Sequence, residues 1–99
     1  EMGVCGPDQP GKETPVRKSQ MAVAARPEFK GTAKYVKTGE YFDMTAWGMW
    51  KDGSWGKANK EAFSKLASDR PYHYMGSAKT FFMMGDAIGK GMVELLQKK

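Results

Sequence analysis

Large aliphatic side chains are scarce in this chain. Val, Ile, Leu and Phe together account for only 14 of the 99 residues, and the formal net charge is +5. A chain with less than roughly 20% of these residues and appreciable charge lies at the border of intrinsic disorder, because it buries too little apolar surface to offset the entropy of ordering. Eight Met, four Tyr and three Trp supply most of the other large apolar groups. This composition argues against a large self-sufficient core and against a multidomain enzyme.

The first forty residues are the least suited to folding alone. They contain five Gly and four Pro, and Val is their only large aliphatic residue type. Each proline fixes its own φ and moves the preceding residue out of the helical region. We therefore expect residues 1–40 to be an extended segment that a partner orders, with room for one short helix from Val16 to Ala25. Residues 35–42 fit a short hairpin turning at Gly39 or an extended passage, and we favour the extended passage.

Residues 41–99 are predicted to form a small helical region with an aromatic cluster. Asp43 can cap a helix of about two turns, because its carboxylate can accept the free amides of the first turn. A second helix is expected from Lys57 to Asp69, with Lys57 and Glu61 paired on its outer side. The predicted fold class is thus small and mainly α: an extended N-terminal segment, two or three helices, and at most one short hairpin.

The last helix, which follows Ser77 as its N-cap, is the clearest element. Its apolar residues recur at steps of three and four, which is typical of an amphipathic helix: Phe81, Met84, Ile88, Met92 and Leu95. Charges of alternating sign recur every fourth residue on the opposite side: Asp86, Lys90, Glu94 and Lys98. Gly85 and Gly89 form a small-xxx-small pair that would let another backbone approach closely. The alternative is that the glycines, with Gly91, only weaken the helix.

Catalytic and metal-binding motifs are missing from the sequence. Cys5 and His73 are the single cysteine and the single histidine, so neither an internal disulfide nor a zinc-ligand spacing is available. No phosphate loop, nucleophile elbow or dinucleotide-binding motif occurs, and the carboxylates are scattered singly. We therefore predict that the chain is not an enzyme and has no cofactor of its own.

His73 is the one candidate for contact with a cofactor. It lies between Tyr72 and Tyr74, just before the last helix. A neutral imidazole there could ligate the magnesium of a chlorophyll, or contact another pigment, if a surrounding complex supplied the pocket. The simpler interpretation, which we favour, is a histidine that is exposed or hydrogen-bonded at the entrance of the helix.

The charge balance permits an anionic partner without identifying one. Lys and Arg number 16 against 11 acidic residues, which permits binding to nucleic acid or to anionic membranes. The surplus is +2 over residues 1–40, +1 over 41–71 and +2 over 72–99, which indicates a dispersed charge. No apolar run reaches the roughly 20 residues of a membrane span, so membrane contact is expected to be peripheral at most.

These features favour a non-catalytic accessory or linker subunit that docks onto other subunits of a larger assembly. The expected partner-binding residues are aromatic, apolar or small: Trp47, Trp50, Trp55, Phe81, Met84, Gly85, Ile88, Gly89, Met92 and Leu95. The first residue is Glu rather than Met, which fits truncation or processing after organelle import. The expected setting is a membrane-associated photosynthetic complex (a photosystem) or a respiratory complex, with the plastid thylakoid favoured over the mitochondrion. The alternative is a small basic nucleic-acid-binding protein whose Trp and Tyr rings stack on bases.

Overall fold

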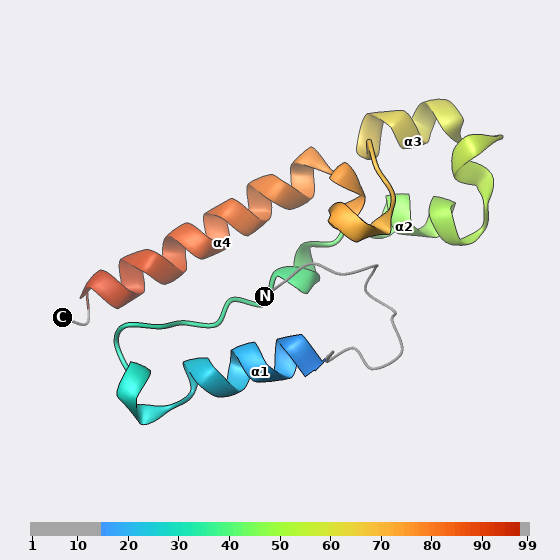
Figure 1. The fold of residues 1–99 in the computed structure, drawn as a ribbon. Coiled ribbons are helices and arrows are strands. Elements are labelled where there is room, and N and C mark those ends of the chain that lie inside the picture. The colour runs from blue at the N-terminus through green and yellow to red at the C-terminus, as the bar shows by residue number, and fades with distance from the viewer. Residues whose placement is uncertain (1–14, 98–99) are drawn as a thin grey trace.

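The structure, a computed structural model, describes residues 15–97 and is helical, with no strand among those residues. Figure 1 shows its four α-helices: α1 (Pro15–Ala24), α2 (Met44–Lys51), α3 (Lys60–Leu66) and α4 (Ala78–Gln97). The predicted mainly α fold class is confirmed. Cys5, Lys98 and most of the N-terminal Gly and Pro residues lie outside the described residues.

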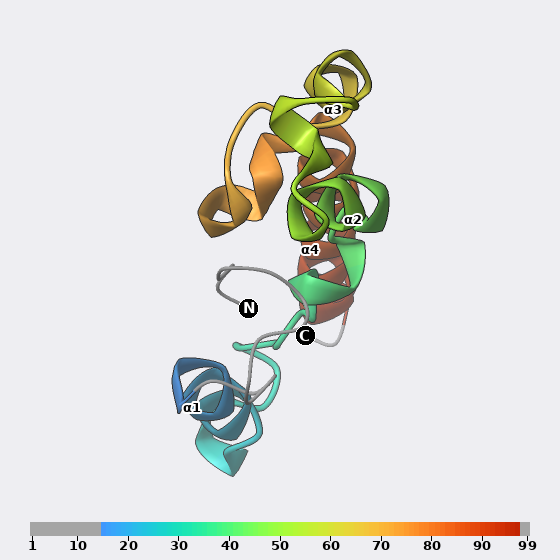
Figure 2. The same ribbon diagram turned by 90° about the vertical axis from the view of Figure 1, so that its right-hand side faces the viewer.

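The molecule is long and thin, with two unlike ends. It measures 52 × 26 × 14 Å and has a radius of gyration of 15.9 Å, larger than the roughly 13 Å of a compact domain of 100 residues. In Figures 1 and 2, α2 and α3 gather around the start of α4, and the rest of α4 runs away from them. We call residues 38–84 the compact end, and residues 15–37 together with 85–97 the thin end.

Capping side chains fix where two of the helices begin, as predicted. The Asp43 carboxylate accepts hydrogen bonds from the backbone N–H groups of Thr45 and Ala46, with N···O distances of 3.1 and 3.0 Å. The hydroxyl oxygen of Ser77 accepts from the N–H of Thr80 at 3.3 Å. All three bonds satisfy amides that have no partner within the helix. The bond to Ser77 fixes the start of α4, which carries the candidate site.

The second predicted helix is shorter than expected at both ends. Lys57 has φ −127° and ψ −109°, which is not helical, so α3 starts only at Lys60. The expected pair between Lys57 and Glu61 therefore does not form, and Glu61 instead pairs with Lys65 at 3.2 Å. At the other end Ala67 is already extended, so the helix stops before Asp69. Two short 3₁₀ turns, η3 (Ser54–Gly56) and η4 (Pro71–Gly76), flank this helix.

The N-terminal part of the described chain combines a helix with extended backbone. α1 begins and ends one residue before the short helix expected over residues 16–25, and it is followed by the 3₁₀ turn η1 (Pro27–Phe29). Residues 33–37 are extended, and the 3₁₀ turn η2 (Thr38–Tyr41) follows them in place of a hairpin. The favoured extended passage is thus observed up to residue 37. The hairpin alternative is wrong, because these extended residues run beside α4 and the 3₁₀ turn η2 follows them. A Cβ added to Gly91 of α4 would lie 3.3 Å from Val36 Cγ2.

The core lies entirely in the compact end. Its buried residues are mostly aromatic or small: Phe42, Ala46, Trp47, Phe63, Ala67, Tyr74 and Met75. The Phe42 and Trp47 rings meet edge to face at 5.7 Å between centroids, a favourable aromatic geometry. A buried hydrogen bond of 2.7 Å joins the hydroxyls of Thr38 and Tyr74. Aromatic rings and satisfied polar groups thus replace the missing aliphatic core.

Candidate protein-docking surface

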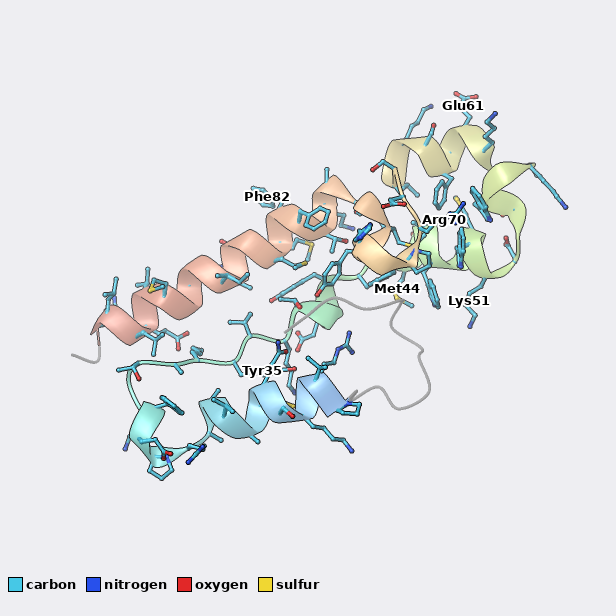
Figure 3. All side chains as sticks on the ribbon, in the orientation of Figure 1. Tyr35, Met44, Lys51, Glu61, Arg70 and Phe82 are labelled. Carbon is cyan, nitrogen blue, oxygen red and sulfur yellow. The ribbon has the colours of Figure 1, made fainter. Side chains whose placement is uncertain are left out.

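One side of α4 is apolar and open to solvent along most of the helix. Its large apolar side chains are each about half exposed or more, with Phe82 at 79% and Leu96 at 60%. At 100° per residue these positions and two exposed glycines fall within an arc of about 140°. We call this arc the α4 face: Phe81, Phe82, Gly85, Ile88, Gly89, Met92, Val93 and Leu96. Figure 3 shows Phe82 on the side of α4 that faces away from α1.

The structure splits the predicted apolar stripe of this helix into an inner and an outer part. Met84 packs against the core and Leu95 is half-buried, so these two residues hold α4 to the rest of the chain. Phe81, Ile88 and Met92 remain exposed. Phe82, Val93 and Leu96 were not predicted from the sequence, because the expected apolar stripe was narrow. A full helical wheel places these residues beside Gly85 and Gly89, and this was the signal that could have found them.

The three glycines of α4 have different surroundings. A Cβ added to Gly85 or Gly89 would meet no atom within 4 Å, so both positions are open. At Gly91, which is buried, the same Cβ would lie 3.3 Å from Val36 Cγ2. Close approach within the described chain therefore occurs at Gly91, while Gly85 and Gly89 leave two shallow positions on the α4 face.

Three charged residues of α4, Asp86, Lys90 and Glu94, lie on a separate side of the helix and are paired. Lys90 Nζ lies 2.6 Å from Asp86 Oδ2, as predicted from their spacing, and this hydrogen bond raises the pKa of Lys90. Glu94 pairs with Lys34 of the extended segment, which lies 60 residues earlier in the sequence. Lys34 therefore ties the extended segment to α4. Among the described residues of α4, no charged side chain interrupts the α4 face.

The three tryptophans lie in the compact end and differ in exposure. Trp47 is only 9% exposed and belongs to the core, so the expectation that it lies at a partner surface is corrected. Trp50 packs against the core and against Trp55, with ring centroids 4.9 Å apart, and Trp55 is 36% exposed. A buried Trp47 cannot stack on a base, and this removes one of the rings on which the nucleic-acid alternative depended.

A tight turn in η4 sets the position from which α4 starts. Tyr74 and Met75 both have positive φ, of 51° and 61°, although neither is glycine, and Gly76 follows at 60°. The Met75 carbonyl accepts from the N–H groups of Ser68 and Asp69 at 2.9 and 3.0 Å, and both side chains of the turn are buried. Left-handed backbone at such residues costs about 1–2 kcal/mol each and persists only where the surroundings fix it. The turn is therefore a structural anchor for α4.

His73 lies on the surface of the same turn. Its side chain is 72% exposed, and its Nδ1 lies 2.6 Å from Asp69 Oδ2. An ionised carboxylate carries no proton, so the ring nitrogen donates this bond, and the bond lowers the pKa of Asp69. This matches the simpler interpretation of an exposed, hydrogen-bonded histidine. Contact with chlorophyll or another pigment stays a prediction.

Over residues 15–97 the structure offers no membrane-spanning helix and no cluster of three potential metal ligands. Comparisons of the chain with protein-family models, with curated proteins and with solved structures find no match. The function is therefore proposed from the physical properties of the surface.

Proposed function

We propose that the chain is a non-catalytic accessory subunit that docks onto another protein of a larger assembly through the α4 face. The observation that carries this proposal is the exposure of Phe82, Ile88, Met92, Val93 and Leu96 along one side of a single helix. Monomeric proteins rarely leave a contiguous apolar surface of this kind uncovered, and such surfaces mark protein or membrane contacts. The alternating, paired charges on the polar side of α4 favour a protein over an anionic membrane, whose surface helices have a mainly basic polar side.

The energetics of this surface suit a stable contact. Fully burying one exposed large apolar side chain contributes about 1.5–3 kcal/mol. The side chains of the α4 face are about half exposed or more, so each would contribute part of that amount toward the cost of association. Gly85 and Gly89, which have nothing within 4 Å of an added Cβ, would let a partner helix or loop lie close to the backbone of α4. The resulting interface would be helical, apolar and centred near Ile88.

The kind of assembly is proposed on the sequence alone. A photosynthetic complex is the first choice and a respiratory complex the second, with the plastid thylakoid favoured over the mitochondrion. Non-catalytic function is proposed because the single histidine of the sequence, His73, and its partner Asp69 are exposed to solvent, where water screens any effect on reactivity.

The test replaces Ile88 with Asp and follows the tagged chain in an extract of its source. Ile88 is half exposed, so the substitution leaves the core untouched but places a charge where the partner would exclude water. An unpaired buried carboxylate costs several kcal/mol or must take up a proton, so co-migration with the high-mass assembly should be lost. Gln97→Asp, at an exposed position on the polar side of α4, is the matched control and should still co-migrate.

Two results would contradict the proposal. One is an unmodified chain that migrates as a free monomer in the source extract. The other is an Ile88→Asp variant that joins the assembly as well as the unmodified chain does. Circular dichroism of both variants checks that α4 is retained, so that a loss of docking is not a loss of helix.

A further inference from the structure

The positive charge of the chain is concentrated in residues 15–37. This stretch contains a single acidic residue, Glu28, and six basic ones: Arg17, Lys18, Arg26, Lys30, Lys34 and Lys37. Its net charge of +5 equals that of the whole chain, so the other residues are neutral overall. The charge was expected to be dispersed because acidic residues on either side of this stretch lower the average over residues 1–40, and that expectation is corrected. The stretch forms α1, η1 and the extended segment, which lie together beside the far half of α4 in Figures 1 and 2.

Several of these cations are available to a partner. Arg26 pairs with Glu28 at 2.5 Å, Lys34 pairs with Glu94, and Arg17 is buried. The remaining three are exposed and make no ion pair with any residue from 15 to 97: Lys18, Lys30 and Lys37. A field of like charge that is not neutralised locally attracts an anionic surface and weakens as salt rises.

Apolar side chains and a groove lie among the same cations. Val16 and Val23 of α1 are each 47% exposed, and Phe29 of η1 is 37% exposed. A groove of about 950 Å³ runs between α1, the turn after it and the far end of α4. Apolar and cationic side chains share its lining, among them Met21, Ala24, Leu95, Arg26, Lys30 and Lys34. Figure 3 shows Tyr35, which also lines the groove, between α1 and the extended segment.

We propose that residues 15–37 form a docking surface for anionic phospholipid, in which lysines meet headgroup phosphates and apolar side chains enter the interface. Cations interleaved with exposed Val and Phe are typical of segments that bind at a membrane surface. Nucleic acid fits less well, because single strands are bound on several stacking rings and Phe29 is the one exposed ring in this stretch. The proposal is independent of the α4 face: it gives the chain a membrane contact at its thin end and a protein contact along α4.

The test uses the full chain and flotation with lipid vesicles. The vesicles are pure phosphatidylcholine, or phosphatidylcholine with roughly a third phosphatidylglycerol. We expect binding to the anionic vesicles only, falling as salt rises. A triple variant that removes the three exposed lysines should weaken binding by roughly 100-fold, because each lysine near an anionic surface contributes about fivefold. It combines Lys18→Gln, Lys30→Gln and Lys37→Gln. None of these substitutions breaks an ion pair within residues 15–97.

The matched control removes three exposed lysines of equal charge from elsewhere: Lys57→Gln, Lys60→Gln and Lys79→Gln. This variant should bind anionic vesicles within about twofold of the unmodified chain. Equal losses in the two triple variants would overturn the proposal, since net charge alone would then explain binding. Displacement of the chain from vesicles by glycerol phosphate at constant ionic strength would also overturn the proposal, in favour of a site for free phosphate. Tighter binding to an oligonucleotide than to vesicles at physiological salt would overturn it as well.

The apolar part of the surface is tested by Phe29→Ser. We expect a severalfold further loss of vesicle binding, because a phenyl group would no longer leave water. Unchanged binding would overturn the claim that apolar side chains enter the interface. Ile88→Asp is used only in the co-migration test, and the lysine and Phe29 variants are used only in the vesicle test, so failure of this proposal and failure of the α4 docking proposal are distinguishable.

Discussion

The compact end and the thin end of the molecule are held together by different means. In the compact end, rings pack at close distances and buried polar groups are satisfied, as in the 2.7 Å bond between the hydroxyls of Thr38 and Tyr74. In the thin end, a close approach at Gly91, the half-buried Leu95 and the pair between Lys34 and Glu94 join the extended segment to α4. Exposed ion pairs of that kind contribute at most about 1 kcal/mol.

This difference between the two ends shows which part of a chain with few aliphatic residues contributes most to its stability. Aromatic residues close to one another in sequence, such as Phe42 and Trp47, make a core with little chain to order. The thin end leaves its apolar side chains, such as Ile88 and Leu96, on the surface. We infer that the compact end folds by itself and that partners complete the thin end.

The largest expected contrast lies between Trp47 in the core and Phe82 on the α4 face. Trp47→Ala should destabilise the compact end by about 3–5 kcal/mol, because it leaves a cavity among buried rings. Phe82→Ala should change stability by less than about 0.5 kcal/mol, because Phe82 is 79% exposed. Chemical denaturation followed by far-ultraviolet circular dichroism measures both. Similar costs for the two variants would abolish the distinction between the buried core and the exposed α4 face.

Two glycines give the next contrast, with opposite signs. Gly76 has φ +60°, and an added Cβ would lie 3.1 Å from the backbone N of Asp69 and closer still to the Ser68 hydroxyl. Gly76→Ala should therefore destabilise the fold by roughly 2 kcal/mol. Gly89→Ala should stabilise it by up to about 1 kcal/mol, since nothing lies near the added methyl group and Ala favours a helix. Thermal melts that show two changes of the same sign would disprove the assignment of these positions.

A smaller effect is expected from one buried hydroxyl. Thr38→Val removes the hydrogen bond to Tyr74 in a site where Thr38 is 1% exposed. The cost should be about 1–2 kcal/mol, because the variant loses a buried hydrogen bond between two hydroxyls. Thr32→Val is the control in the thin end, where the hydroxyl donates to the Phe29 carbonyl at an exposed position, and it should cost almost nothing. Equal effects would show that the thin end is as tightly built as the compact end.

The smallest effect concerns the exposed pair of Asp69 and His73. The hydrogen bond from the ring lowers the pKa of Asp69, so its contribution to stability is complete above the ordinary pKa of an aspartate and is lost as pH falls through the lowered value. In an NMR titration, His73→Ala should raise the midpoint of the Asp69 carboxyl. An unchanged midpoint would show that this bond does not form in solution.

The parts of the fold that the sequence predicted are those with local causes. Asp43 and Ser77 cap their helices because the required amides lie two or three residues away. The predicted start of α3 was wrong because a hydrogen bond between the Asn59 and Ser54 side chains holds the turn before this helix. Helix propensities do not reveal such a bond. The left-handed backbone at Tyr74 and Met75 had no sequence signal, since tertiary packing imposes it.

The candidate site was predicted only in part for a similar reason. Periodicity identified α4 as amphipathic, but a helix with apolar residues over a wide arc does not show which part of the arc faces inward. The packing of Met84 against the core decides this, and it leaves Phe82, Val93 and Leu96 outside. Trp47 was assigned to a partner surface because tryptophan is common there, although in this chain it is needed for the core.

Amide hydrogen exchange across the whole chain tests the central claim most directly. In the isolated protein, the amides of α2 and of the start of α4 should exchange slowest, while residues 15–37 and 85–97 exchange far faster. On joining its assembly, residues 85–97 should gain protection and α2 should change little. Equal, strong protection of all residues from 15 to 97 in the isolated protein would contradict the account, because the thin end would then need no partner.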